Sequence, residues 1–141
     1  MPRHKRELTE GDLLHALPQD YMNKRQIEFF RRRLFEIRRQ LLQNVNETGE
    51  YLRTTTVVVP DPCDRATQEE EQAIELRVRD RERKLLKKVE QALARIEGGT
   101  YGFCEETGEP IGVRRLLVRP IAILSLDAQE RREKSERVYG D

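Results

Sequence analysis

The chain has 141 residues, of which 38% are charged and 6% aromatic, and it contains no tryptophan. So few large apolar side chains cannot fill a broad globular core, but they can cover the narrow seam of a coiled coil. Its 27 basic and 26 acidic residues give a formal net charge of +1, which excludes a general attraction to nucleic acid or anionic lipid.

Residues 1–22 form a lead-in whose leucines indicate a short amphipathic helix before Pro18. No apolar stretch approaches the roughly 20 residues that span a bilayer, and none follows the basic N-terminus as in a signal peptide. We therefore expect a cytoplasmic protein with no membrane partner. Its two cysteines, Cys63 and Cys104, lie too far apart to pair and should stay reduced.

A long helix is predicted from Asn23, whose side chain can act as the N-cap. Apolar residues recur along it at steps of three and four and therefore share one stripe. The stripe consists of Ile27, Phe30, Leu34, Ile37, Leu41 and Val45. The remaining faces are rich in arginine, which a solvated surface explains better than contact with an anionic partner.

Residues 60–66, with the sequence PDPCDRA, interrupt this pattern because two prolines prevent a continuous helix. A second helix is expected to begin within Asp61–Asp64, where either aspartate can be the N-cap, and to end at Gly98 and Gly99. Two arms of similar length joined by a short turn predict one antiparallel hairpin about 50 Å long. Its tip would present two carboxylates.

The glycine-rich residues 101–120 predict tight turns with one or two small strands, and Ser125 can cap a last helix. The expected fold is mainly α, with a long antiparallel coiled-coil hairpin, a small zinc-ribbon-like globular part lacking zinc, and a C-terminal helix. The expected boundaries are a segment 1–22 that packs with the globular part, the hairpin 23–97 with its tip at 60–66, the globular part 98–124 and the helix 125–141.

Four positions in and after the globular part have the spacing of a four-cysteine zinc ribbon, but only the first is a cysteine. They are Cys104, Thr107, Ser125 and Ala128. Hydroxyl groups are poor zinc ligands at neutral pH, and neither histidine lies nearby in the sequence. We therefore expect a degenerate site without metal, in which Cys104 is a plain buried thiol.

Several motifs, in this order along residues 21–137, resemble the DksA/TraR family of bacterial regulators that bind RNA polymerase. They are Tyr21–Asn23, Phe30–Leu34, Pro60–Ala66, Gln68–Glu71, Glu75–Leu85, Tyr101–Cys104, Ile111–Arg115 and Arg119–Pro120. The family usually carries four zinc cysteines and this chain keeps the first, so it is similar to a cysteine-poor, zinc-independent branch.

The resemblance implies a transcription regulator, not an enzyme, that binds RNA polymerase directly and does not bind specific DNA sequences. Its hairpin would enter the secondary channel of the polymerase, and the tip residues Asp61, Asp64 and Ala66 would lie near the active centre. There they would alter the stability of open promoter complexes. Arg81 would make a further contact with the polymerase.

The resemblance also implies an effector, the stringent-response nucleotide ppGpp, bound at Leu85, Lys88 and Arg119. Lysine and arginine pair strongly with phosphate oxygens, which makes such a set chemically reasonable. Gln129 stands where the family commonly has a lysine, and the loss of that cation should weaken phosphate binding.

Two other functions fit parts of the pattern. A Gre-type transcript-cleavage factor also projects carboxylates on a hairpin, where they help to hold a catalytic Mg²⁺. A coiled-coil interaction scaffold would need only the hairpin. The PDPCD sequence of the tip resembles the DksA/TraR family more than a Gre-type factor. The near-zero net charge weighs against a scaffold that binds DNA.

Overall fold

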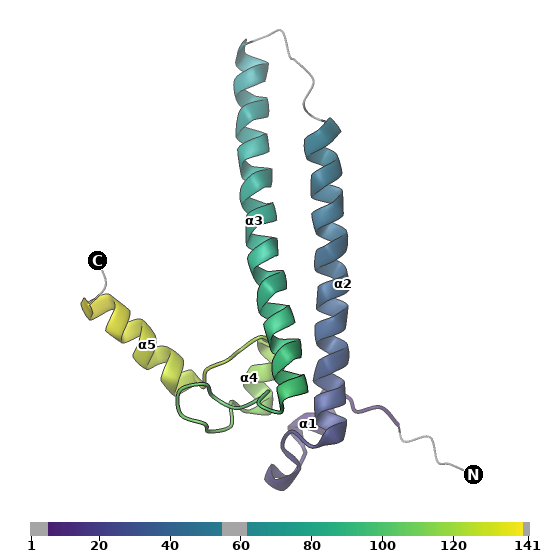
Figure 1. Cartoon of the computed structure of the whole chain (residues 1–141), viewed down its shortest axis with the longest axis vertical. Coiled ribbons are helices and arrows are strands. Elements are labelled where there is room, and N and C mark those ends of the chain that lie inside the picture. The colour runs from purple at the N-terminus through teal and green to yellow at the C-terminus, as the bar shows by residue number, and fades with distance from the viewer. Residues whose placement is uncertain (1–5, 55–61, 140–141) are drawn as a thin grey trace. The chain divides into compact units, whose positions relative to one another are not determined.

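The computed structural model describes residues 6–54 and 62–139, with the side chains of residues 6–44 and 64–138 (Figure 1). The elements are α1 (Glu10–Leu14), the 3-10 helix η1 (Pro18–Asp20), α2 (Lys24–Thr54), α3 (Pro62–Gly98), α4 (Val113–Val118) and α5 (Leu126–Tyr139). The predicted mainly α fold is confirmed. None of the described helices is long and apolar enough to cross a bilayer.

The chain divides into two compact units, which are described separately. The globular unit comprises residues 1–35 and 91–141, and the hairpin unit comprises residues 36–90. Within the hairpin unit, α2 and α3 run antiparallel as a coiled-coil hairpin (Figure 1). The Nε atom of Arg38 in α2 lies 3.8 Å from the Oε1 atom of Glu90 in α3, and Val89 of α3 is fully buried.

The start of α2 follows the predicted cap. The Gln26 backbone N–H donates to the Asn23 side-chain oxygen at 2.9 Å, and the Ile27 N–H donates to the Asn23 carbonyl at 2.9 Å. These bonds satisfy donors that the first turn of a helix leaves without partners. On the predicted apolar stripe, Phe30 and Leu34 are fully buried in the globular unit.

The second long helix also has the predicted ends, since α3 begins at Pro62 and ends at Gly98. Gly99 follows with a φ of +78°, a left-handed conformation that glycine adopts without a steric penalty. The Thr100 N–H then donates back to the Arg95 carbonyl at 3.0 Å. This arrangement satisfies a carbonyl at the end of the helix and stops it.

The strands predicted within residues 101–120 are wrong. Among the described residues there is no strand, only an isolated antiparallel bridge between Phe103 and Pro110, and α4 occupies the run 113–118. The Leu116 N–H donates to the Gly112 carbonyl at 3.1 Å, which closes the first helical turn. An apolar run this short does not carry enough periodicity to separate a helix from a strand.

The globular unit is held together by aromatic residues from separate segments. The Tyr21 hydroxyl donates to the Gly102 carbonyl and accepts from the Gly112 N–H at 2.9 Å. The Tyr101 hydroxyl donates to the Pro120 carbonyl at 2.7 Å, and the Tyr101 ring packs against Phe30 with 5.7 Å between centroids. These contacts tie the start of α2 to the turns before and after α4.

Candidate functional site

The expected tip residues fall at the start of α3. Asp64 and Ala66 are exposed, and Asp64 lies in the first turn of the helix. A carboxylate there is favoured by the positive end of the helix dipole, so a structural role and accessibility to a partner coexist at this position. Asp61 lies outside the described residues.

Three of the expected contact residues lie on one face of α3. Arg81, Leu85 and Lys88 follow one another at steps of four and three, which places them along a single helical stripe. Arg81 and Lys88 are exposed and Leu85 is half-buried. Neither cation forms an ion pair with another of the described residues. The stripe therefore offers two accessible positive charges with an apolar side chain between them.

The fourth residue of this set, Arg119, belongs to the globular unit, where it follows the last residue of α4. Its backbone N–H donates to the Arg115 carbonyl at 2.7 Å, and its side chain is exposed. Gln129, the expected departure from the family, donates from its side-chain amide to Glu133 at 3.0 Å. An acidic neighbour is a further reason to expect weaker phosphate binding at that position.

The four expected zinc-ribbon positions differ in exposure. Cys104 is 3% exposed and Ala128 is fully buried, whereas Ser125 is half-buried and Thr107 is exposed. Ser125 has the predicted capping role, because its hydroxyl accepts from the Ala128 N–H at 3.2 Å at the start of α5. Cys104 is a free thiol in a tight turn, in which the Gly108 N–H donates to the Cys104 carbonyl at 2.8 Å.

The sulfur of Cys104 is surrounded by hydrogen-bond donors. Burial acts to raise the pKa of this thiol, but the Thr107 hydroxyl and the backbone N–H groups of Ser125, Thr107 and Glu106 outweigh it and lower the pKa to about 6. The donors stabilise the thiolate more than the neutral thiol. Cys104 is buried, as expected, but its lowered pKa favours the thiolate near neutral pH.

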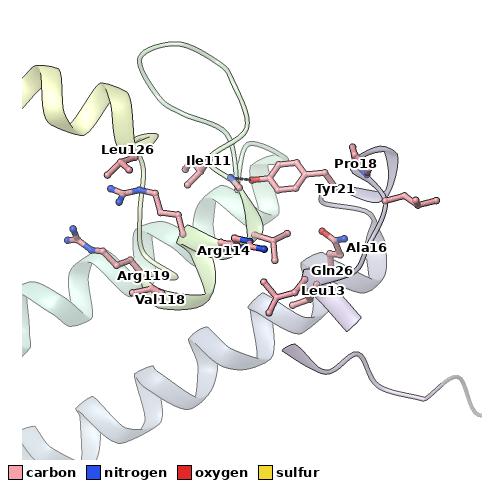
Figure 2. A pocket seen from close by; sticks show the side chains of 15 residues that line it. Leu13, Ala16, Pro18, Tyr21, Gln26, Ile111, Arg114, Val118, Arg119 and Leu126 are labelled. Atoms are coloured by element: carbon pink, nitrogen blue, oxygen red, sulfur yellow. Dashed lines mark hydrogen bonds between the residues drawn. The ribbon is translucent and has the colours of Figure 1, made fainter. Parts of the chain in front are cut away.

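A cavity that was not expected from the sequence lies in the globular unit. It has a volume of about 700 Å³ and is lined by residues from α1, η1 and the segment around α4. Figure 2 shows Leu13 and Gln26 together with residues such as Ile111 and Arg114 around it. No local pattern signals this cavity, because its walls come from segments far apart in the sequence.

Comparisons with known proteins match most of the chain. Residues 26–96 match the family model of the DksA N-terminal domain, and residues 99–134 match that of the prokaryotic dksA/traR C4-type zinc finger. The RNA polymerase-binding transcription factor DksA of Caulobacter vibrioides is 49% identical over 95% of this chain and 94% of its own length. That of Escherichia coli K12 is 45% identical over 84% of this chain and 79% of its own length.

A solved structure is similar in fold. The transcription factor DksA2 from Pseudomonas aeruginosa superposes with a TM-score of 0.84 at 43% sequence identity. The similarity covers 92% of this chain and 99% of that one. A coiled-coil hairpin with a small globular part is thus an arrangement that the solved relative shares.

The match to a C4-type zinc finger contradicts the expectation that this region is built without a metal. That expectation came from ligand identity at four positions, whereas the match rests on the whole segment 99–134. The four positions in this chain supply one thiol, two hydroxyls and a methyl group, and the described residues contain no group of three or more His, Cys, Asp or Glu side chains that could hold a metal ion. These donors do not fit a zinc ion, so the mechanism proposed below uses none.

Proposed function

The chain belongs to the DksA/TraR family, and from this membership we propose that it is a transcription regulator that binds RNA polymerase through the secondary channel and changes the stability of open promoter complexes. The relatives in Caulobacter vibrioides and Escherichia coli are named RNA polymerase-binding transcription factors. The family models cover the hairpin and the globular part, so both parts of the proposed regulator are present.

The observation that carries the proposal is the exposed first turn of α3 at the far end of the hairpin unit. Asp64 and Ala66 are accessible there, and Val89 farther along the same helix is fully buried. A two-helix coiled coil is stiff enough to hold a carboxylate at its tip. In the proposed mechanism, Asp64 and Asp61 contact mobile elements near the polymerase active centre and perform no chemistry themselves.

The proposal includes ppGpp as an effector held between the regulator and the polymerase. Leu85 and Lys88 would contact it from α3, and Arg119 would contact it from the globular unit, while Arg81 would contact the polymerase. The exposed cations that pair with no other described residue support this assignment, because they are available to phosphate oxygens. Gln129 leaves the set with one cation fewer than the family commonly has.

The proposal is tested by binding and transcription with purified RNA polymerase. We expect the protein to compete with a Gre-type factor for the polymerase and to cause no cleavage of backtracked RNA. We expect Lys88→Ala to reduce the additional effect of ppGpp while leaving the effect of the protein alone. Lys87→Ala, an exposed neighbour on a different face of α3, is the matched control.

Binding that a Gre-type factor does not displace would reject the secondary channel as the site. Cleavage of backtracked RNA would instead favour a cleavage factor. A ppGpp effect that Lys88→Ala and Lys87→Ala change equally would remove Lys88 from the proposed effector site.

A further inference from the structure

The cavity of the globular unit opens onto exposed apolar side chains. Leu14 is 45% exposed, Leu17 57%, Leu126 56% and Val118 81%, and all four line it. Clustered exposed apolar residues mark interaction surfaces more often than scattered ones do. The apolar wall therefore continues from the cavity onto the surface, as in a groove that receives part of another protein.

The charges around the cavity have one sign. Three arginines line it and no aspartate or glutamate does. The Arg115 side chain donates to the Leu124 carbonyl at 3.0 Å and so has a structural role, but exposed Arg114 forms no ion pair with any described residue. In the view of Figure 2, Arg114 lies nearer to Leu13 and Gln26, and Arg119 extends away from them beside Val118.

One buried amide adds a second kind of donor. Gln26 is 2% exposed and lines the cavity, and its side-chain oxygen accepts from the Met22 N–H at 3.0 Å. Its Nε2 group donates to none of the described residues. The Tyr21 hydroxyl already donates once and accepts once. The polar groups left for a partner are therefore donors, and they favour a ligand that supplies an acceptor.

We propose that this cavity is a docking site for an acidic amphipathic helix of a partner protein. The apolar face of the helix would lie between Leu17 and Val118, with its carboxylates toward Arg114 and an acceptor toward Gln26. A helix in a groove uses this combination of apolar anchors and flanking charges. The site is separate from the hairpin tip and shares Arg119 with the proposed ppGpp site, but the inference does not depend on the proposed function.

The test uses the full-length protein and a short fluorescein-labelled helical peptide with leucines at i, i+3 and i+7 and glutamates beside them. We expect saturable binding that weakens with salt, and no binding of a peptide with the same residues in scrambled order. Arg114→Glu should weaken binding about fivefold or more, since it replaces an attraction by a repulsion. A peptide with lysine in place of glutamate should bind Arg114→Glu better than it binds the wild type.

The control variants make the same substitutions, arginine to glutamate and valine to serine, at exposed positions of α5 away from the cavity. Arg131→Glu should leave binding unchanged, and Val118→Ser should weaken it about tenfold while Val138→Ser does not. Equal losses in Arg114→Glu and Arg131→Glu would overturn the proposal, as would equal binding of the scrambled peptide. Saturable binding of decanoate without binding of the helical peptide would assign the cavity to a small carboxylate instead.

Discussion

Gly102 combines a backbone conformation and a close contact that both require glycine. Its φ is +88°, and a Cβ atom at this position would lie 2.7 Å from the Met22 side chain. Gly102→Ala is therefore expected to lower the free energy of unfolding by about 2–3 kcal/mol, since a left-handed conformation and overpacking both add a cost. Thermal and urea unfolding of the purified variant would measure the loss.

Gly108 offers the matched control, because its φ is +73° but a Cβ atom would meet nothing within 4 Å. Gly108→Ala should carry only the conformational cost of about 1 kcal/mol. If the free energy of unfolding falls equally in the two variants, the contact with Met22 does not contribute to the effect of Gly102→Ala.

Cys104 makes stability depend on pH in a defined direction. Its pKa is about 6 in the folded protein, because the Thr107 hydroxyl and backbone N–H groups outweigh the effect of burial, and about 9.0 for an unperturbed thiol. The lowered pKa means that the unfolded state binds more protons between these values. The contribution of Cys104 is then complete above about pH 9 and lost as the pH falls to 6.

Urea unfolding at pH 6 and pH 9 measures this contribution, which is at most ~4 kcal/mol. Cys104→Ser, whose hydroxyl does not titrate in this range, should lack that part of the pH dependence. The absorbance of the thiolate at 240 nm, followed with a chelator present, should rise with a midpoint near pH 6. A midpoint above pH 8 would contradict the role of the surrounding donors.

Residues whose roles are local could be predicted from the sequence, whereas those that act across the fold could not. Asn23 and Ser125 have the capping bonds that their positions indicate, because a cap bonds only to the next few residues. The donors around the Cys104 sulfur come from two separate turns. The cavity beside Gln26 also depends on packing between distant segments, so no spacing in the chain reveals it.

At the scale of elements, the two long helices could be predicted from the spacing of their apolar residues. The packing of the turns of the globular unit, in contrast, depends on the hydrogen bonds of single hydroxyl groups. Tyr21→Phe would leave the Gly102 carbonyl and the Gly112 N–H without their partner. Since Tyr21 is half-buried, we expect a loss of about 1–3 kcal/mol in the free energy of unfolding.

Tyr101→Phe removes a single hydrogen bond to the Pro120 carbonyl and should cost less in urea unfolding. A loss in Tyr101→Phe as large as that in Tyr21→Phe would show that the bridging hydroxyl is not special.

The contrast between α3 and α4 shows why some elements could be predicted. α3 has 37 residues, so the spacing of its apolar residues recurs over many helical turns. Proline at its start and glycine at its end mark its limits. α4 has 6 residues and is fixed by packing, with Leu116 fully buried and Val118 81% exposed. Without the surrounding core, the same residues are equally compatible with a strand.

At the scale of the whole molecule, the motifs of the hairpin and the globular part identify the family more securely than they identify its cofactor. Counting zinc ligands led to the expectation of a metal-free part, whereas residues 99–134 as a whole match a C4-type zinc finger. The segment matches although three of the four positions have no cysteine. In this segment, the residues at the four ligand positions and the match of the whole segment to a family therefore lead to different expectations about zinc.

The charge of Asp64 is the centre of the proposed function, because this side chain is exposed at the start of the long helix α3. Asp64→Asn keeps much of the hydrogen-bonding capacity and removes the charge. Glu71→Gln removes one charge from an exposed site farther along the same helix and is the matched control.

The most direct measurement is in vitro transcription from a ribosomal RNA promoter with purified RNA polymerase, with and without ppGpp. The wild type and Glu71→Gln are expected to lower transcript yield, and more so with ppGpp, whereas Asp64→Asn should bind the polymerase equally well and lose this effect. Inhibition by Asp64→Asn equal to that by the wild type would contradict a charge-based role for the tip.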